Sequence, residues 1–321
     1  MPASPSVTFI VLLVCLSGSL AAFFIAAGFR RPRTPRPLPS HPVPAAPSPE
    51  QAFAGPEASP FQTPAFPGDP ASPPPPLPVG KVAVWPYRML DLIWMGFIVL
   101  MFSLLSLSNA AMVESRAEVT ISANGLIQSI AFQLVIAALT VAMVAWRVRP
   151  VAWLGLDWKG WRWALLIGPA AVLVMWGVSI GLYLCGYMDL MNTLGVENSQ
   201  ESVKLLQETQ DPLVLTLMAA AAVLVAPLCE EVVFRGYLYP AAKRFAGPWV
   251  AGAASALIFA AAHGSLFPLL PLFVFGALLV LAYELTGSLW APIAMHFCFN
   301  GATVGIQLVV RLSGIELPDS L

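Results

Sequence analysis

The sequence has little charge, and this scarcity excludes several classes of protein. Its 321 residues include 16 Lys and Arg, 17 Asp and Glu and three His, which give a formal net charge of −1. No basic tract indicates nucleic-acid binding, so no nucleic-acid partner is expected. Hydrophobic residues make up 58% of the chain, and the mean hydropathy is +0.77. The composition therefore predicts an all-α, polytopic bundle of helices that spans a lipid bilayer.

Cysteine is also scarce. The four cysteines are Cys15, Cys185, Cys229 and Cys298, and all of them lie in apolar stretches. Their spacing matches no metal-site pattern, and thiols in a lipid environment seldom pair, so we expect no disulfide framework. Cys229 precedes a glutamate but has no basic partner in its own stretch, so we interpret it as a small packing residue rather than a nucleophile.

The N-terminal apolar segment, residues 7–29, is long enough to span a bilayer, and four arginines follow it within seven positions. Because basic residues favour the cytoplasmic side, we predict an uncleaved transmembrane anchor over residues 1–31 with its N-terminus outside the cell membrane. A cleaved secretory signal is the alternative, although such a signal carries its positive charge before the apolar run.

Residues 32–80 are dominated by Pro, Ala and Ser. This composition cannot bury a core, so it predicts a disordered, cytoplasmic linker between the anchor and the following helices. We interpret the linker as a spacer. Its proline-rich runs leave open a second interpretation, in which it docks an unidentified partner that recognises polyproline.

Seven further apolar runs follow, which gives about eight spans in all. They cover residues 89–108, 125–146, 163–188, 213–235, 248–263, 267–285 and 289–310. Basic residues in alternate connections predict an up-and-down topology. The basic residues expected on the cytoplasmic side are Lys81, Arg88, Arg147, Arg149, Lys159, Arg162, Arg235, Lys243 and Arg244. We therefore predict additional helices over residues 81–163, a core over 164–310 and a short tail over 311–321.

Ionisable residues interrupt the apolar runs at three places in the last third of the chain. Such a residue at bilayer depth costs at least about 2.5–3.5 kcal/mol unless it is paired, so it is a functional candidate. In the first stretch, CEEVVFRG, Glu231 and Arg235 are four residues apart with the acid first, which favours an ion pair on one helix face. Glu230 then points about 100° away and is free to act as a general base. The alternative is an ion cluster that only holds helices together.

The other two stretches are FAAAH, which ends at His263, and HFCFN, which contains His296 and Asn300. His296 and Asn300 share one helix face, and two donors in a water-poor cavity suit the stabilisation of an oxyanion. A simple interhelical hydrogen bond is the alternative. For all three stretches to converge, the helix that ends at His263 must begin below the membrane surface or break at Gly264 and Pro268. This condition predicts an intramembrane, funnel-like catalytic cavity.

These three stretches, in this order, resemble the motifs EExxxR, FxxxH and HxxxN of the CPBP family of intramembrane proteases. That family includes CAAX prenyl endopeptidases and bacterial relatives linked to bacteriocin immunity. The resemblance covers residues 164–310 and implies that Glu231 and Arg235 support the site. It also implies an intramembrane endopeptidase whose partners are the lipid bilayer and a membrane-anchored peptide or protein substrate, of which prenylated CAAX tails are one class. A catalytically idle scaffold or immunity protein of the same fold is the alternative.

The resemblance also implies roles for the remaining polar residues. Glu230 and His263 would activate a water that attacks a peptide carbonyl, and His296 and Asn300 would hold the oxyanion. Members of the family are commonly described as metalloproteases, and two His with one Glu match a catalytic zinc ligand set. In that version His263, His296 and Glu230 bind the metal and the neighbouring glutamate is the base. We prefer the metal-free version, because adjacent glutamates do not easily reach one metal centre.

Overall fold

The structure is a computed structural model that describes residues 5–29, 80–114, 122–196 and 209–313. Residues Met1–Arg30 and Val79–Leu321 form one compact unit, and only this unit is described below. The predicted Pro/Ala-rich linker over residues 32–80 lies outside the described residues except for Gly80. The predicted C-terminal tail is likewise described only to residue 313.

The described residues form helices and no strands, which confirms the predicted all-α fold class. The long helices are α1 (Pro5–Phe29), α2 (Asp91–Glu114), α3 (Ala123–Ala145), α5 (Ala164–Leu184), α11 (Pro248–Ala262), α12 (Leu269–Thr286) and α13 (Trp290–Ser313). A run of consecutive helical segments precedes α11: α8 (Pro212–Ala220), η3 (Ala221–Val225), α9 (Ala226–Glu230), η4 (Glu231–Leu238) and α10 (Tyr239–Ala246). The short elements are α4 (Pro150–Trp153), η2 (Trp161–Trp163) and α6 (Tyr187–Thr193).

Six of these helical stretches are long and apolar enough to cross a membrane. They are Thr8–Gly28, Ala123–Ala145, Trp161–Leu184, Pro212–Ala246, Leu269–Thr286 and Trp290–Ser313. The other two predicted spans correspond to shorter apolar helices within the described residues, Asp91–Ser106 and Pro248–Ala262. The chain is therefore an integral, multi-pass membrane protein, and the prediction of eight spans is approximate.

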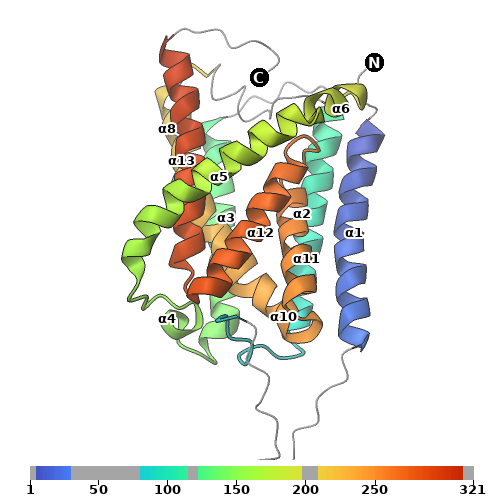
Figure 1. The fold of residues 1–321 in the computed structure, drawn as a ribbon, viewed down its shortest axis with the longest axis vertical. Coiled ribbons are helices and arrows are strands. Elements are labelled where there is room, and N and C mark those ends of the chain that lie inside the picture. Colours follow the sequence, from blue (N-terminus) through green and yellow to red (C-terminus); the bar gives the residue numbers. More distant parts are fainter. Residues whose placement is uncertain (1–4, 30–79, 115–121, 197–208, 314–321) are drawn as a thin grey trace, which may run out of the picture. The chain divides into compact units, whose positions relative to one another are not determined.

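The helices alternate in direction, as the charge pattern predicted (Figure 1). The N-terminal end of α1, the short helix α6 and the C-terminal end of α13 lie at the upper end of the view. The segment before α2, the helix α4 and the helix α10 lie at the lower end. These lower segments carry most of the basic residues of the connections, including Arg88, Arg149 and Arg244.

Two basic residues that were predicted to face the cytoplasm are instead buried. Arg235 is 0% exposed and Lys243 is 8% exposed. Both lie in one helical stretch that continues to Ala246, beyond the predicted end at residue 235. The Lys243 ammonium forms an ion pair with Glu284 on α12 and donates a hydrogen bond to the Val82 carbonyl. Arg235 pairs with Glu231 four residues earlier, so both cations are neutralised within the bundle and neither marks an exposed connection between spans.

The first helix, α1, which corresponds to the predicted anchor, packs against other helices of the bundle. It packs against α11, α2 and α10. Its residues Leu12, Leu16 and Phe23 are at most 3% exposed and belong to the main hydrophobic core. This contact places α1 directly on the helix that leads to His263.

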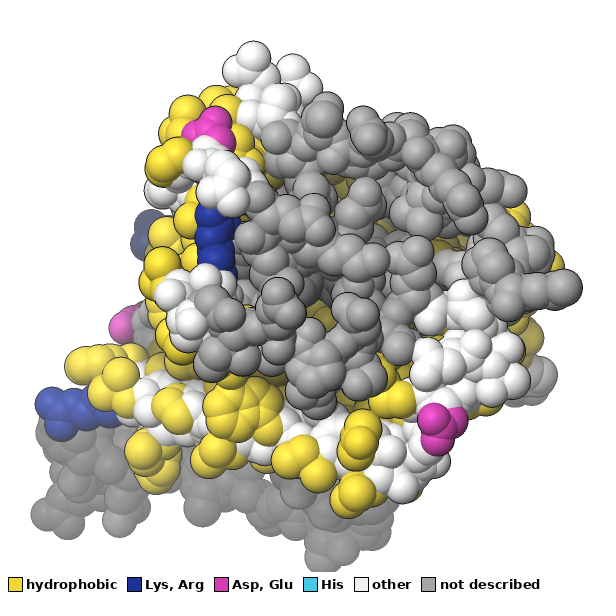
Figure 2. Space-filling model, turned by 90° about the horizontal axis from the view of Figure 1, so that it is seen from above, with side chains coloured by type: hydrophobic (Ala, Val, Ile, Leu, Met, Phe, Trp, Pro, Cys, Tyr) yellow, Lys and Arg dark blue, Asp and Glu magenta, His cyan; other side chains and the backbone are white. Residues whose placement is uncertain are grey.

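The outer surface is apolar, as expected for a protein surrounded by lipid. Large side chains on α5 such as Leu165 and Leu184 are 67% and 77% exposed. Seen from the end at which α6 lies, the described surface is largely hydrophobic with only scattered charged side chains (Figure 2). Exposed apolar area of this extent is unusual for a water-soluble monomer and fits contact with lipid chains.

Candidate active site

The helical stretch that carries the first motif is not a regular α-helix. The π-helical segments η3 and η4 are followed by Pro227 and Pro240, respectively. Proline lacks a backbone N–H, and its ring clashes with the carbonyl four residues earlier, so it disturbs α-helical bonding at both places. Single-turn π segments within α-helices are frequent at functional sites. Glu230 ends the short helix α9 between these two irregular segments, and Glu231 is the first residue of η4.

The predicted ion pair between Glu231 and Arg235 is present and fully buried. The Arg235 guanidinium donates to Glu231 Oε1 at 2.9 Å, and both side chains are 0% exposed. His296 from α13 binds the same oxygen, with Nδ1 2.8 Å from Glu231 Oε1. Arg235 also donates to the Gly276 carbonyl of α12 at 3.3 Å. One carboxylate therefore joins η4 to α13, and its arginine joins η4 to α12.

Glu230 is separated from this pair, as the spacing predicted. Its side chain is 23% exposed, whereas that of Glu231 is completely buried. Its Oε2 has no hydrogen-bond partner and lies 3.9 Å from His296 Nε2. Glu230 is therefore the more accessible carboxylate of the motif, although its Oε2 atom, like Oε2 of Glu231, is buried without a hydrogen-bond partner.

His263 lies at the end of α11, next to the residues Gly264 and Pro268 at which a break was predicted. The helix ends at Ala262, Gly264 has a φ of +70°, and α12 begins directly after Pro268. His263 Nδ1 is 2.9 Å from the Phe259 carbonyl oxygen. Because a carbonyl only accepts, Nδ1 carries the proton, which leaves Nε2 of the neutral ring as an acceptor.

The phenyl ring of Phe259 is the point at which the three motifs meet, and the sequence analysis did not single it out. Its centroid is 5.1 Å from the ring of His263 and 5.9 Å from that of His296, both edge-on. The Arg235 guanidinium lies over the same ring at 4.2 Å. The only sequence signal for this role is its place as the first residue of FAAAH.

The structure does not bring all the predicted residues into direct contact. Within the described residues, Glu230 and His263 share no hydrogen bond or ion pair, although the proposed water activation would use both. Their connection runs through His296, which faces Glu230, and through Phe259, which contacts both imidazoles. A joint action of Glu230 and His263 therefore remains a prediction.

Asn300 makes a contact that explains its position on α13. Its Nδ2 donates to the Ala222 carbonyl at 2.8 Å. That carbonyl lacks both usual backbone donors, since the Ala226 N–H bonds to Ala221 instead and Pro227 has no N–H. Asn300 thus satisfies a carbonyl that the π segment η3 leaves without a donor, and its second amide N–H remains for another acceptor.

The ligand set of the zinc alternative does not form a metal site in this arrangement. No group of three or more His, Cys, Asp or Glu residues in the described ranges is placed to hold a metal ion. His296 Nδ1 is occupied by Glu231, and His263 does not contact Glu230. No chemical step proposed below therefore runs through a metal.

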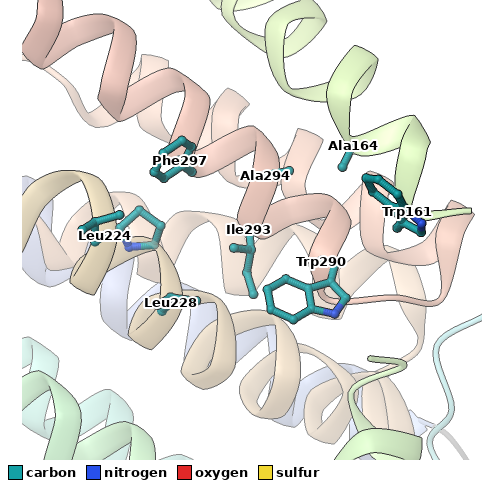
Figure 3. A pocket seen from close by; sticks show the side chains of 9 residues that line it. Trp161, Ala164, Leu224, Leu228, Trp290, Ile293, Ala294 and Phe297 are labelled. Atoms are coloured by element: carbon teal, nitrogen blue, oxygen red, sulfur yellow. The ribbon is translucent and has the colours of Figure 1, made fainter. Parts of the chain in front are cut away.

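An apolar cavity of about 450 Å³ lies beside the polar residues, between α5, α9 and α13 (Figure 3). Its lining residues are Trp161, Ala164, Leu224, Pro227, Leu228, Trp290, Ile293, Ala294 and Phe297. None of the six predicted site residues lines it, so the predicted funnel at the polar residues remains a prediction. Leu228 precedes Glu230 by two positions and Phe297 follows His296 directly, so both helices reach the cavity close to the site.

Comparison with known proteins supports the motif assignment. Residues 212–302 match the family description "Type II CAAX prenyl endopeptidase Rce1-like", and this segment contains all six predicted site residues. Over 112 residues the chain is 30% identical to a protein of Bacillus subtilis (strain 168) named "Putative membrane peptidase YdiL". That similarity covers 35% of this chain and 43% of the relative. No solved structure matches the chain. The resemblance to a CPBP-family protease is thus confirmed over the segment that carries the motifs.

Proposed function

We propose that this protein is an intramembrane endopeptidase that hydrolyses a peptide bond of a membrane-tethered substrate. The observation that carries the proposal is the difference between the two adjacent glutamates. Glu231 is completely buried and bonded to both Arg235 and His296, whereas the Glu230 side chain is 23% exposed and forms no bond to Arg235. A carboxylate held in this way suits general-base catalysis. The Rce1-like match over residues 212–302 supports the same reaction class.

In the proposed reaction, a water lies between the Glu230 carboxylate and Nε2 of His263. Glu230 removes a proton from the water, and the oxygen attacks the carbonyl carbon of the scissile peptide. The carbonyl electrons move to the oxygen, which gives a tetrahedral oxyanion. When this intermediate collapses, the C–N bond breaks and Glu230 returns its proton to the leaving amine. The products are one carboxylate and one amine.

His296 is the proposed donor to the oxyanion. Its neighbours are two carboxylates and, through Glu231, one guanidinium. In this role both ring nitrogens carry a proton, so that Nδ1–H donates to Glu231 and Nε2–H is left for the oxyanion. Its Nε2–H then faces the space beside Glu230. The free amide N–H of Asn300 is proposed as a second donor.

The apolar cavity is the proposed site for a hydrocarbon chain attached to the substrate, as in prenylated CAAX tails. Its lining side chains are all apolar apart from two indole N–H groups, and it adjoins both helices that supply Glu230 and His296. Replacing Leu228 with Trp would fill part of it (Figure 3). We expect L228W to raise KM for a prenylated peptide and to leave KM for the same peptide without the chain unchanged. An equal effect on both peptides would exclude this site for the hydrocarbon chain.

The proposed orientation in the cell membrane has the N-terminus outside and the segment before α2 in the cytoplasm. It rests on the basic residues at the end of the bundle where α4 and α10 lie. Single cysteines at Trp85 and Asn192, introduced in a chain without its native cysteines, would test it in intact cells. A membrane-impermeant thiol reagent should label position 192 but not position 85, and the reverse labelling would invert the topology.

The proposed activity is tested with purified protein in proteoliposomes and a panel of lipid-anchored peptides in water labelled with heavy oxygen. We expect a new C-terminal carboxylate that carries one heavy oxygen atom, detected by mass spectrometry. Each peptide is supplied with and without a prenyl group, which separates the general activity from the substrate class. Failure to cleave any anchored peptide, with folded and inserted protein, would contradict the proposal.

A further inference from the structure

Pro240 also leaves a backbone carbonyl, that of Gly236, without its α-helical donor. The Tyr87 hydroxyl binds this carbonyl. In an α-helix the Gly236 carbonyl would accept from residue 240, but position 240 is a proline without an N–H. The Tyr87 hydroxyl donates to the Gly236 oxygen at 2.5 Å. The arrangement parallels that of Asn300 and the Ala222 carbonyl on the other side of Glu230.

Tyr87 is held firmly in this position. It is 2% exposed, and its hydroxyl oxygen accepts a hydrogen bond from Trp153 Nε1 at 2.7 Å. Its ring packs edge-on against Tyr237 of η4, with centroids 5.7 Å apart. Burial raises the pKa of Tyr87 well above its usual value, so the hydroxyl keeps the proton that it donates.

A second contact fixes the same turn of the helix. The Tyr237 hydroxyl donates to Asp91 Oδ1 at 3.0 Å, and Arg147 binds the same carboxylate through both of its terminal nitrogens. Asp91 is 1% exposed. The end of η4 is therefore attached to the segment before α2 and to the end of α3, both of which lie outside residues 212–302.

We infer that Tyr87 is a positioning residue that holds η4 in its π-helical register and thereby sets the direction of Glu230. A change of one residue in register rotates one part of a helix against the other by about 100°. Without the Tyr87 hydroxyl, η4 loses one of the bonds that favour the wider register. Glu230 would then turn relative to Tyr237, which stays attached to Asp91.

The inference rests on the proposed endopeptidase activity for its kinetic consequence, but the register itself can be measured without any activity. Two spin labels at Leu228 and Arg244 lie on either side of η4, and 16 residues of α-helix would separate them by about 24 Å. Both positions are exposed. Because Leu228 lines the cavity proposed for the hydrocarbon chain, kinetic constants are measured on protein without the labels. The labels require a chain whose native cysteines have been replaced.

The test variant is Tyr87→Phe, which removes the hydroxyl and keeps the ring. We expect the label-to-label distance to shift or split into two populations. We also expect kcat per folded molecule to fall about 10- to 100-fold with little change in KM, because a small misplacement of a catalytic group has an effect of this size. The matched control is Tyr283→Phe, since Tyr283 is 2% exposed and its hydroxyl makes no hydrogen bond within the described residues. The control should leave the distance and kcat unchanged.

If Tyr87→Phe does not fold, a second variant, Pro240→Ala, tests the inference. Pro240→Ala restores an N–H that can bond to the Gly236 carbonyl in the α-helical register, so it should move the distance in the same direction with Tyr87 intact. An unchanged distance in the variant that folds, or an equal effect of Tyr283→Phe, would overturn the inference. If wild-type protein cleaves no peptide, the proposed function fails, and the distance measurement alone decides the role of Tyr87.

Discussion

Arg235 is the largest of the fully buried side chains in the described core. Its charge is balanced by Glu231, and its guanidinium lies over Phe259 and reaches the Gly276 carbonyl. A buried cation with these partners is not a substrate-binding group, because its contacts are already made within the protein. At the scale of single residues, the motif thus divides into a fixed part, Glu231 with Arg235, and an available part, Glu230.

Arg235→Met should destabilise the protein strongly, because it leaves a buried carboxylate without its cation. Breaking a buried pair in this way costs roughly 3–5 kcal/mol in the free energy of unfolding. Adding Glu231→Gln in the same chain should recover part of this loss, since the remaining charge is then removed. The measurement is unfolding in detergent by heat or denaturant. Glu230→Gln is the matched control and should have a much smaller effect on the free energy of unfolding. Equal losses from Arg235→Met and Glu230→Gln would contradict the distinction between a structural Glu231–Arg235 pair and an accessible Glu230.

The sequence could predict the Glu231–Arg235 pair, because an i,i+4 spacing on one helix brings its own partners together. It could not predict the contacts of Phe259 or the bond from Asn300 to the Ala222 carbonyl. The first depends on three helices meeting, and the second on a π segment that leaves a backbone oxygen without a donor. The joint role of Glu230 and His263 is predicted from the sequence, and no contact in the structure tests it.

At the scale of elements, the close approach of α11 and α12 holds the site together. A Cβ atom built on Gly276 would lie 3.1 Å from both Cα and Cβ of Ala256. The backbones therefore meet at a position where only glycine fits comfortably, as small residues do at membrane helix interfaces. The Gly276 carbonyl at this contact also accepts the hydrogen bond from Arg235.

Gly276→Ala should push α11 and α12 apart and lower both stability and peptide cleavage. The neighbouring atoms include the backbone of Ala256, which cannot move aside as a flexible side chain could. The matched control is Gly177→Ala in the middle of α5, where no atom lies within 4 Å of the added methyl group. The unfolding midpoint in detergent and the cleavage rate in proteoliposomes should both be lower for Gly276→Ala than for Gly177→Ala. Equal values for the two variants would mean that the close contact between α11 and α12 is not needed for stability or cleavage.

Most elements could be predicted from apolar run length, and their bounds agree with the structure within a few residues. A break at Gly264 and Pro268 was one of two ways in which the sequence allowed the three motifs to meet, and α11 and α12 are separated at these residues. The extension to Ala246 of the span predicted over residues 213–235 was not predicted. Pro240 and the charged Lys243 read as an end signal, whereas the π segment accommodates the proline and Glu284 pairs with the lysine.

At the scale of the whole unit, α1 is the element whose packing the sequence indicated least. It covers faces of α11, α2 and α10 with buried residues such as Leu16 and Phe23. Composition alone marked it as an isolated apolar segment before a proline-rich linker, and no sequence pattern indicated which helices it would contact. Its contact with α11 connects it to the helix that positions His263.

Deleting α1 should therefore impair the enzyme, whereas shortening the linker should not. A chain that begins at Lys81 exposes the faces of α11 and α2 that α1 buries, so we expect a lower unfolding midpoint and reduced cleavage. The matched variant keeps α1 and removes residues 36–70, which leaves enough chain to extend about 50 Å. It should retain the stability and activity of the full chain. Normal behaviour of the chain that begins at Lys81 would show that α1 is dispensable, as a simple anchor would be.

The most direct test of the proposed function is the Glu230→Gln variant in proteoliposomes with a lipid-anchored peptide. The amide keeps the shape of the side chain but cannot accept the proton of the attacking water. Cleavage should fall about 10²- to 10⁴-fold, the usual contribution of a general base. Membrane insertion and the thermal unfolding midpoint should remain those of the wild type, since the Glu230 side chain is partly exposed and makes no hydrogen bond within the described residues that the substitution would break. Near-normal turnover by correctly folded Glu230→Gln protein would contradict the account.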